Sequence, residues 1–358
     1  MTELASFLEE EIAAGSFPGG SALVGSSDSV LAAASAGHAA LVPAPSPLGS
    51  ETLFDLASLT KPLAAGALAH AAMEAGLDLA SPPGRFFPAW KKTRFDGITL
   101  ESLLTHTAGL PAWFPLYVRG EGVAMYRRTL SEIEPVALPG STVLYSDLGL
   151  LVFGEVLETF FSSPVDRSYD EIVAAPCGSK ALYLPNAATT SAATEEGDAT
   201  ERKMTAELGL SYPRFRTGVV RGEVHDGNAL RRGGVSAHAG LFGTAEDVWR
   251  LSRPWLAPDR RDLVRDRTPG LAEARGIVWQ GARGARSLSE SVELPGRISE
   301  RAFGHTGFTG TSVWLDPEID RIYVLLTNRV HPRAEGDFNA VRRRFHALVA
   351  AGEEWGAS

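Results

Sequence analysis

The sequence predicts a single α+β domain in which both ends of the chain contribute to one antiparallel sheet. Near the N-terminus, residues 2–14 have helical spacing and precede two strand-like segments, Ser21–Gly25 and Val30–Ala36. Near the other end, the β-rich segments Gly310–Leu315 and Ile322–Thr327 form a second hairpin. The region between these ends is mostly helical, which indicates a helical insertion rather than a second separable domain.

Each of these elements follows from local residue patterns. Leu4, Leu8 and Ile12 fall four residues apart and therefore share one face of a helix. Ser27 and Asp28 provide turn chemistry between the first two strands. A helix followed by a hairpin is typical of an antiparallel sheet with a helix packed against it.

The middle of the chain is divided into helices and loops. We expect helices at Leu100–Thr105 and Leu148–Phe160, and a final helix at Phe338–Ala350. Residues 41–50 contain three prolines and are predicted to be a loop without regular pairing. The small polar segment Asn186–Thr200 is predicted to be a long surface loop. Within one domain of residues 1–358, we place the sheet at about 1–57 and 295–358 and the helical part at about 58–294.

Composition limits the class of protein. The chain has 358 residues, 44% of them hydrophobic, and a formal net charge of −9, which disfavours a nucleic-acid partner. One cysteine cannot form an internal disulfide. No stretch has about 18 uncharged apolar residues, and the N-terminus is acidic, so we expect no membrane partner and a cytoplasmic location. A processed exported form would have the same sequence.

The first motif that carries chemistry is Ser58 with Lys61. A helix is predicted from Ser58 to Gly76, and Pro62 is tolerable only if that helix begins close to Ser58. Serine and lysine three residues apart lie on one face of a helix, where lysine can take the serine proton if its own pKa is lowered. The helix N-terminus also offers backbone N–H groups to an oxyanion.

Two further motifs lie far away in the sequence. Tyr145, followed by Asp147, stands before the helix predicted at Leu148–Phe160. A tyrosine near a lysine can ionise more easily and serve as general base and acid. The segment Phe303–Gly310 contains His305, which can hold or lose a charge near neutral pH, among glycines that let a ligand approach the backbone.

Together the three motifs resemble the serine β-lactamase and penicillin-binding-protein superfamily, most closely its class C-like branch of esterases, peptidases and amidases. That family carries S-x-x-K, Y-x-N and K/H-T-G, which match here Ser58 with Lys61, Tyr145 with Asp147, and His305-Thr306-Gly307. The segment Ile98–Pro111 matches a further hallmark of the family, and the resemblance spans roughly residues 3–350. It implies a three-layer sandwich of helices around an antiparallel sheet.

The resemblance also implies a mechanism. Ser58 would attack an amide or ester carbonyl to give an acyl-enzyme, while Lys61 and Tyr145 share the proton transfers. Which of the two is the principal base is open within the family. The backbone amides of Ser58 and Phe308 would form the oxyanion hole. His305 and Thr306, with Gly307, would bind a substrate carboxylate or steady Tyr145. No cofactor is expected, and the histidines at positions 225, 238 and 305 do not have the spacing of a metal site.

Two positions depart from the family pattern. Asp147 replaces the usual asparagine, and an ionised carboxylate could pair with Lys61 and hold it charged, which would shift more of the base role to Tyr145. His305 replaces the lysine of the β-lactamases, which weakens a fixed positive charge for a substrate carboxylate. If the charge of His305 supports binding, kcat/KM should fall as pH rises through its pKa.

A second polar group is expected to help form the pocket. Val219–Ala229 and Gly233–Phe242 resemble segments of a subgroup that includes intracellular N-acetylmuramyl-L-alanine amidases, and they contain His225, Asp226 and His238. A dense polar cluster among glycines suits a pocket wall. These three side chains could equally have structural roles, and His106 is assigned a packing role.

The sequence therefore predicts a serine hydrolase with a small-molecule substrate. A muropeptide amidase or peptidase ranks first, a cytoplasmic carboxylesterase second, and a β-lactamase with weak side activity third. A non-catalytic ligand sensor on the same fold is the alternative of another class, and it would predict loss of Ser58, Lys61 or Tyr145, all of which are present. The oligomeric state is left open.

Overall fold

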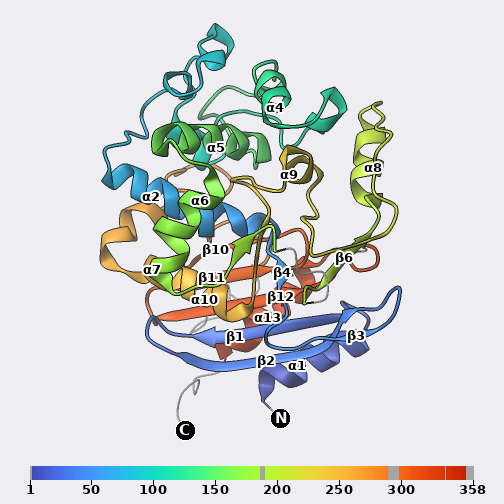
Figure 1. The fold of residues 1–358 in the computed structure, drawn as a ribbon. Coiled ribbons are helices and arrows are strands. Elements are labelled where there is room, and N and C mark those ends of the chain that lie inside the picture. The colour runs from blue at the N-terminus through green and yellow to red at the C-terminus, as the bar shows by residue number, and fades with distance from the viewer. Residues whose placement is uncertain (1, 186–189, 289–297, 335, 352–358) are drawn as a thin grey trace.

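A seven-stranded antiparallel sheet, ordered β3-β2-β1-β12-β11-β10-β9, joins the two ends of the chain (Figure 1). In this computed structural model the described residues are 2–185, 190–288, 298–334 and 336–351. The strands of the sheet are β1 (Gly19–Gly25), β2 (Val30–Ala40), β3 (Ser46–Pro47), β9 (Gln280–Gly281), β10 (Phe303–Thr306), β11 (Ser312–Asp316) and β12 (Arg321–Thr327).

Helices cover both faces of this sheet. Alternate residues of β12 point to opposite sides: Tyr323 and Leu325 pack with α1 (Glu3–Ala13) and α13 (Asn339–Ala351), while Val324 and Leu326 join the larger core. Helix α10 (Ala245–Ser252) contacts β1 and β12 on that second side. The predicted α+β sandwich of three layers is therefore confirmed.

The helical part lies above the sheet in Figure 1, between β4 and α11 in the sequence. Its helices are α2 (Ala67–Glu74), α3 (Leu100–Leu104), α4 (Val123–Leu130), α5 (Asp147–Phe161), α6 (Val165–Tyr169), α7 (Ala175–Cys177), α8 (Ala199–Glu207), α9 (Gly227–Arg232) and α11 (Arg261–Val264). Two small sheets accompany them, β4-β8-β5 and β6-β7, made of β4 (Phe54–Asp55), β5 (Leu182–Tyr183), β6 (Ala193–Glu196), β7 (Val219–Arg221) and β8 (Leu241–Gly243).

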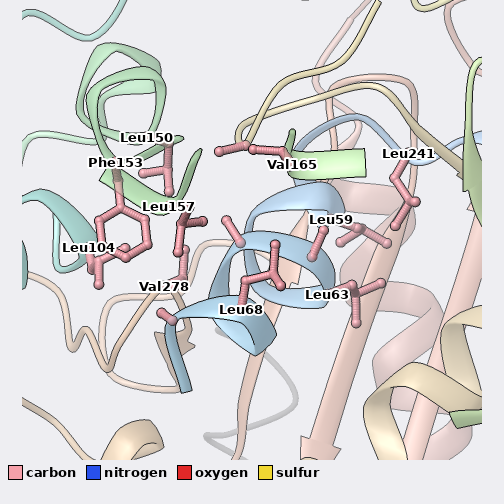
Figure 2. Close-up of a cluster of buried hydrophobic side chains, with 14 of the residues drawn as sticks. Leu59, Leu63, Leu68, Leu104, Leu150, Phe153, Leu157, Val165, Leu241 and Val278 are labelled. Carbon is pink, nitrogen blue, oxygen red and sulfur yellow. The ribbon is translucent and has the colours of Figure 1, made fainter. Parts of the chain in front are cut away.

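The segment that carries Ser58 is buried in the main core. Ser58 lies in a 3₁₀ turn, Ala57–Leu59, followed by a π-helical stretch, Lys61–Gly66, and then α2. Figure 2 shows Leu59, Leu63 and Leu68 of this segment within the cluster of buried side chains that also contains Phe153 of α5. The apolar residues around Ser58 thus anchor its backbone.

The sequence-based assignments hold for most elements. The helices expected at residues 2–14, 100–105, 148–160 and 338–350 and all four predicted strands are confirmed, with shifts of a few residues at their ends. The continuous helix predicted for Ser58–Gly76 is instead the succession of 3₁₀, π and α turns described above.

Two predicted loops contain regular structure. Within residues 41–50, Ser46 and Pro47 pair with β2, which is compatible with proline because β3 is an edge strand. Residues 186–189 of the second predicted loop lie outside the described residues, but the rest includes β6 and the start of α8, with Thr194 and Glu195 buried. Glu195 accepts hydrogen bonds from Thr200, and this tertiary pairing allows a polar segment to be ordered.

No single helix among the described residues is both long and apolar enough to cross a membrane. Two consecutive helical segments, Asp147–Phe161 and Val165–Cys177, are together long and apolar enough by length and composition alone. They are bent by 71° relative to each other. Residues Leu148–Leu157 of this pair are buried in the core.

The packing around the Ser58 segment generates a prediction about stability. The Leu63→Ala variant should lose about 2–5 kcal/mol of the free energy of unfolding, because Leu63 is 0% exposed and its removal leaves a cavity. Leu138 is 78% exposed, so Leu138→Ala serves as the matched control and should change stability by less than about 0.5 kcal/mol. Denaturant unfolding measures both, and equal effects would contradict this assignment of the core.

Candidate active site

A turn held from both sides presents Ser58. Ala57 has φ +47°, in the left-handed region that costs a residue with a side chain about 1–3 kcal/mol. The buried Asp55 stabilises this turn, because one carboxylate oxygen accepts from the Ala57 amide at 2.8 Å and the other from the His225 amide at 2.7 Å. The nucleophile is thereby fixed to the segment that carries His225 and Asp226.

The turn between β10 and β11 packs on the chain that enters Ser58. A Cβ atom on Gly307 would lie 2.0 Å from Thr311 Oγ1 and 2.8 Å from the Leu56 carbonyl oxygen, so only glycine fits there. Thr311 Oγ1 donates to the Leu56 carbonyl at 3.0 Å. The Phe308 amide donates no hydrogen bond to any described residue, which leaves it available for the oxyanion role predicted from the sequence.

Lys61 links the nucleophile to Asp147. Its Nζ lies 2.7 Å from Ser58 Oγ, 2.8 Å from Asp147 Oδ1 and 3.2 Å from the His238 carbonyl oxygen. Lys61 is fully buried, and burial alone would lower its pKa. The Asp147 carboxylate and the nearby Tyr145 outweigh burial, so the pKa of Lys61 is raised and the side chain is an ammonium. The sequence-based expectation that Asp147 pairs with Lys61 matches this geometry.

Tyr145 is surrounded by cations and imidazoles. Lys61 Nζ lies 4.9 Å and the Arg275 guanidinium carbon 5.6 Å from the centre of its ring. The rings of His106 and His305 lie at 4.5 Å and 5.8 Å between centroids. Burial raises the pKa of Tyr145 even though the Lys61 ammonium opposes that rise. The expectation that Tyr145 ionises easily is therefore wrong, because burial disfavours a phenolate more than one ammonium favours it.

The imidazole of His305 is neutral rather than charged. It is 3% exposed, and burial lowers its pKa well below the usual value, with the Lys61 ammonium and Arg275 adding to the shift. Its Nδ1 lies 2.9 Å from the Thr306 carbonyl oxygen, which can only accept, so Nδ1 carries the proton and Nε2 is an acceptor. This lowered pKa argues against the expected fall of kcat/KM through a His305 titration near neutral pH, and the Thr306 carbonyl is the acceptor that fixes the tautomer.

The second polar group does reach the nucleophile. His225, Asp226 and His238 line, with Ser58, a cavity of about 140 Å³. Asp226 caps α9 by accepting from the Ala229 amide at 2.7 Å and also accepts from His238 Nε2 at 3.0 Å. Burial opposes its charge, but His238 and these hydrogen bonds keep the pKa of Asp226 below its usual value. The three residues therefore have structural partners and also form a wall of the site.

His225 is a buried imidazole with a carboxylate partner. Burial lowers its pKa, but the hydrogen bond with Glu195, at 3.4 Å, reverses that effect and raises it. The His225 ring also stacks on Phe308, with centroids 5.4 Å apart and an interplanar angle of 22°. His225 thus supports the residue whose amide is expected in the oxyanion hole.

One group among the described residues brings metal-ligating atoms together. Asp147, Asp226 and His238 each offer an atom within 4.8 Å of the others. A metal ion there would face the Lys61 ammonium, which lies 2.8 Å from Asp147. Asp226 also already accepts two hydrogen bonds. These residues fit an ammonium-centred network better than a metal site.

Some residues at the site had no signal in the sequence. Ser58 borders a second cavity, of about 330 Å³, to which Tyr145, His305, Thr306 and Gly307 contribute together with several arginines, among them Arg275. In the smaller cavity, Trp113 and Glu201 join the expected residues. Burial and the nearby Asp226 raise the pKa of Glu201 to about 7, although the Gly227 amide and the Tyr117 hydroxyl donate to it. Arg275, Trp113 and Glu201 belong to no recognisable motif, and only folding brings them close to Ser58.

Comparisons with known proteins agree with this geometry. The β-lactamase family model matches residues 4–348. The chain is 29% identical over 356 residues to an N-acetylmuramyl-L-alanine amidase of Bacillus subtilis (strain 168). The aligned region covers 90% of this chain and 80% of that protein.

Solved structures show the same fold at lower identity. One is EstCE1, a hydrolase with promiscuous acyltransferase activity (TM-score 0.72, 21% identity, 96% of this chain and 97% of that chain). Another is a class C β-lactamase (TM-score 0.73, 15% identity, 98% of this chain and 96% of that chain). The family match over nearly the whole chain and the shared fold lead to one conclusion: this chain belongs to the β-lactamase family of serine hydrolases.

Proposed function

We propose that this protein hydrolyses an amide of a muropeptide or cell-wall peptide through an acyl-enzyme on Ser58. The observation that carries the proposal is the position of Lys61 Nζ, 2.7 Å from Ser58 Oγ and 2.8 Å from Asp147. The identity of 29% to a relative named N-acetylmuramyl-L-alanine amidase supports an amide over an ester.

Acylation requires a group that can take the Ser58 proton. Lys61 is an ammonium and Tyr145 a phenol in the resting site, so neither accepts a net proton directly. Asp147 is a carboxylate in contact with Lys61. Lys61 therefore passes one of its protons to Asp147 while it takes the proton of Ser58, whose Oγ forms a bond to the substrate carbonyl carbon.

The leaving group also needs a proton. Tyr145, whose ring centre lies 4.9 Å from Lys61 Nζ, donates its phenolic proton to the leaving nitrogen as the C–N bond breaks. The Lys61–Asp147 pair then returns the proton taken from Ser58 to the Tyr145 phenolate. In deacylation, water attacks the ester carbon and the same groups act in reverse, so that Ser58 regains its proton. The amides of Ser58 and Phe308 bind the oxyanion in both steps.

A labelling experiment tests the nucleophile. The wild-type protein should take up one equivalent of a fluorophosphonate, seen as a mass increase of the intact protein, and Ser58→Ala should take up none. Ser29, an exposed residue of the β1–β2 turn, provides the control, since Ser29→Ala should be labelled like the wild type. Labelling that persists in Ser58→Ala would place the nucleophile elsewhere.

A substrate comparison tests the bond type. The wild-type protein should release L-alanine from N-acetylmuramyl-L-alanine with a higher kcat/KM than that for hydrolysis of p-nitrophenyl acetate, corrected for the uncatalysed rate of each. Tyr145 is positioned to protonate a leaving amine, which an activated ester does not need. A marked preference for the ester would favour the carboxylesterase instead.

The pH dependence of Asp147→Asn tests the proton path. Without the carboxylate, burial remains and the pKa of Lys61 falls, so Lys61 becomes a neutral base only as pH rises through this lowered value. At pH 7 we expect kcat/KM to drop about 100-fold, and to recover toward alkaline pH in the variant but not in the wild type. Asp166→Asn is the control, because this residue of α6 lines neither of the two cavities at Ser58. A variant with the wild-type profile would remove Asp147 from proton transfer.

A further inference from the structure

Tyr145 stands in a part of the chain that has no regular structure of its own. Residues 142–146, which precede helix α5, belong to neither a helix nor a strand. Ser58 and Lys61 differ in this respect, because both lie in hydrogen-bonded helical turns. The position of the Tyr145 hydroxyl therefore depends on contacts from another segment.

One residue of the conserved-looking segment 98–111, His106, holds the chain on both sides of Tyr145. The Leu144 amide donates to the His106 carbonyl at 2.8 Å, and the Ser146 amide donates to His106 Nδ1 at 3.1 Å. The His106 ring also packs against the Tyr145 ring, with centroids 4.5 Å apart and an interplanar angle of 40°. His106 thus contacts the tyrosine and fixes the residues before and after it.

The imidazole is the part of this anchor that depends on a side chain. The segment also has backbone acceptors: the His106 carbonyl, the Pro111 carbonyl for the Ser146 hydroxyl at 2.6 Å, and the Ala112 carbonyl for the Asp147 amide at 2.9 Å. A substitution leaves these carbonyls in place but can remove Nδ1. The amide of Ser146, a residue that is 3% exposed, would then lose its acceptor.

The backbone and the protonation state of His106 suit this role. Its φ of +58° lies in the left-handed region, where histidine is one of the few enriched residues. Burial lowers its pKa well below the usual value, with Arg275 and the Lys61 ammonium adding to the shift, so the ring is neutral. Since Nδ1 accepts, Nε2 carries the proton, and Nε2 makes no hydrogen bond with any described residue. The bond from Ser146 is therefore the one hydrogen bond of this ring to the described residues.

We propose that His106 is the positioning residue for Tyr145, because its imidazole fixes the tyrosine hydroxyl where it can protonate the leaving group. This inference rests on the proposed function, since it uses Tyr145 as the acid for a leaving amine. His106 lines neither of the two cavities at Ser58, so it acts through Tyr145 and not on the substrate. A displacement of about 1 Å in a catalytic group can cost about 100-fold in rate.

Two substitutions separate the acceptor from the ring. His106→Asn keeps an acceptor atom bonded to Cγ, as Nδ1 is in histidine, and asparagine also tolerates the left-handed region, but the ring is lost. His106→Phe keeps an aromatic ring and loses the acceptor. His38, an exposed residue of β2, offers the matched control His38→Phe.

Amide hydrogen exchange measured by NMR tests the anchor without any substrate. The Ser146 amide should exchange about 10-fold or more faster in His106→Phe than in the wild type, because its acceptor is gone. Its rate should stay close to the wild-type rate in His106→Asn and His38→Phe. The amides that pair β1 with β12 report on global unfolding. Unchanged exchange of Ser146 in His106→Phe, equal acceleration in both His106 variants, or an equally large acceleration in the sheet overturns the inference.

Catalysis separates a positioning role from a merely structural one. Release of L-alanine from N-acetylmuramyl-L-alanine needs the Tyr145 proton, whereas reaction of Ser58 with a fluorophosphonate expels fluoride, which needs none. In His106→Phe, kcat for release of L-alanine should fall about 10- to 100-fold, while KM and the rate constant of labelling change less than about threefold. His106→Asn and His38→Phe should keep most of both activities.

The outcomes for the two proposals are distinguishable. Equal losses of hydrolysis and labelling in His106→Phe would indicate damage to the whole site and overturn the inference. If the wild type is labelled but releases no L-alanine, the amidase proposal fails, and the exchange rate of the Ser146 amide still decides whether the His106 imidazole holds the Tyr145 segment.

Discussion

The arrangement of the active site depends on the burial of the Lys61 ammonium. A charged group without water is stable only when counter-charge and hydrogen-bond acceptors surround it. Asp147, at the first residue of α5, and the His238 carbonyl meet this need at 2.8 Å and 3.2 Å. Helix α5, the segment before β8 and the turn that carries Ser58 are therefore held in register by one side chain, and the same contacts supply the proton path.

The sequence was informative where chemistry is local. Ser58 and Lys61 are three residues apart, the motifs of Tyr145 and His305 are short, and the pairing of Asp147 with Lys61 followed from the properties of a carboxylate. The charge of His305 was not predictable, because burial and the field of Arg275 are set by folding. The ordered part of residues 190–200 was missed for a similar reason: its polar side chains find partners, such as Glu195 with His225, only in the folded chain.

Electrostatics divides the site into two halves. Around the smaller cavity, carboxylates and histidines hydrogen-bond with one another, as Asp226 does with His238. Around the larger cavity, arginines outnumber carboxylates, and the neutral His305 contributes no charge. Ser58 borders both cavities, so the two parts of a substrate on either side of the reacting carbonyl meet different electrostatic surroundings.

The wall that α8 adds to the smaller cavity has a consequence for evolution. Thr200, Glu201 and Met204 of α8 line this cavity, yet their segment pairs in its own two-stranded sheet, apart from the seven strands that carry the His305 motif. Substitutions in α8 can therefore alter this cavity while Ser58, Lys61 and Tyr145 stay unchanged. Selection for new substrates and selection for hydrolytic rate then act on different stretches of the gene.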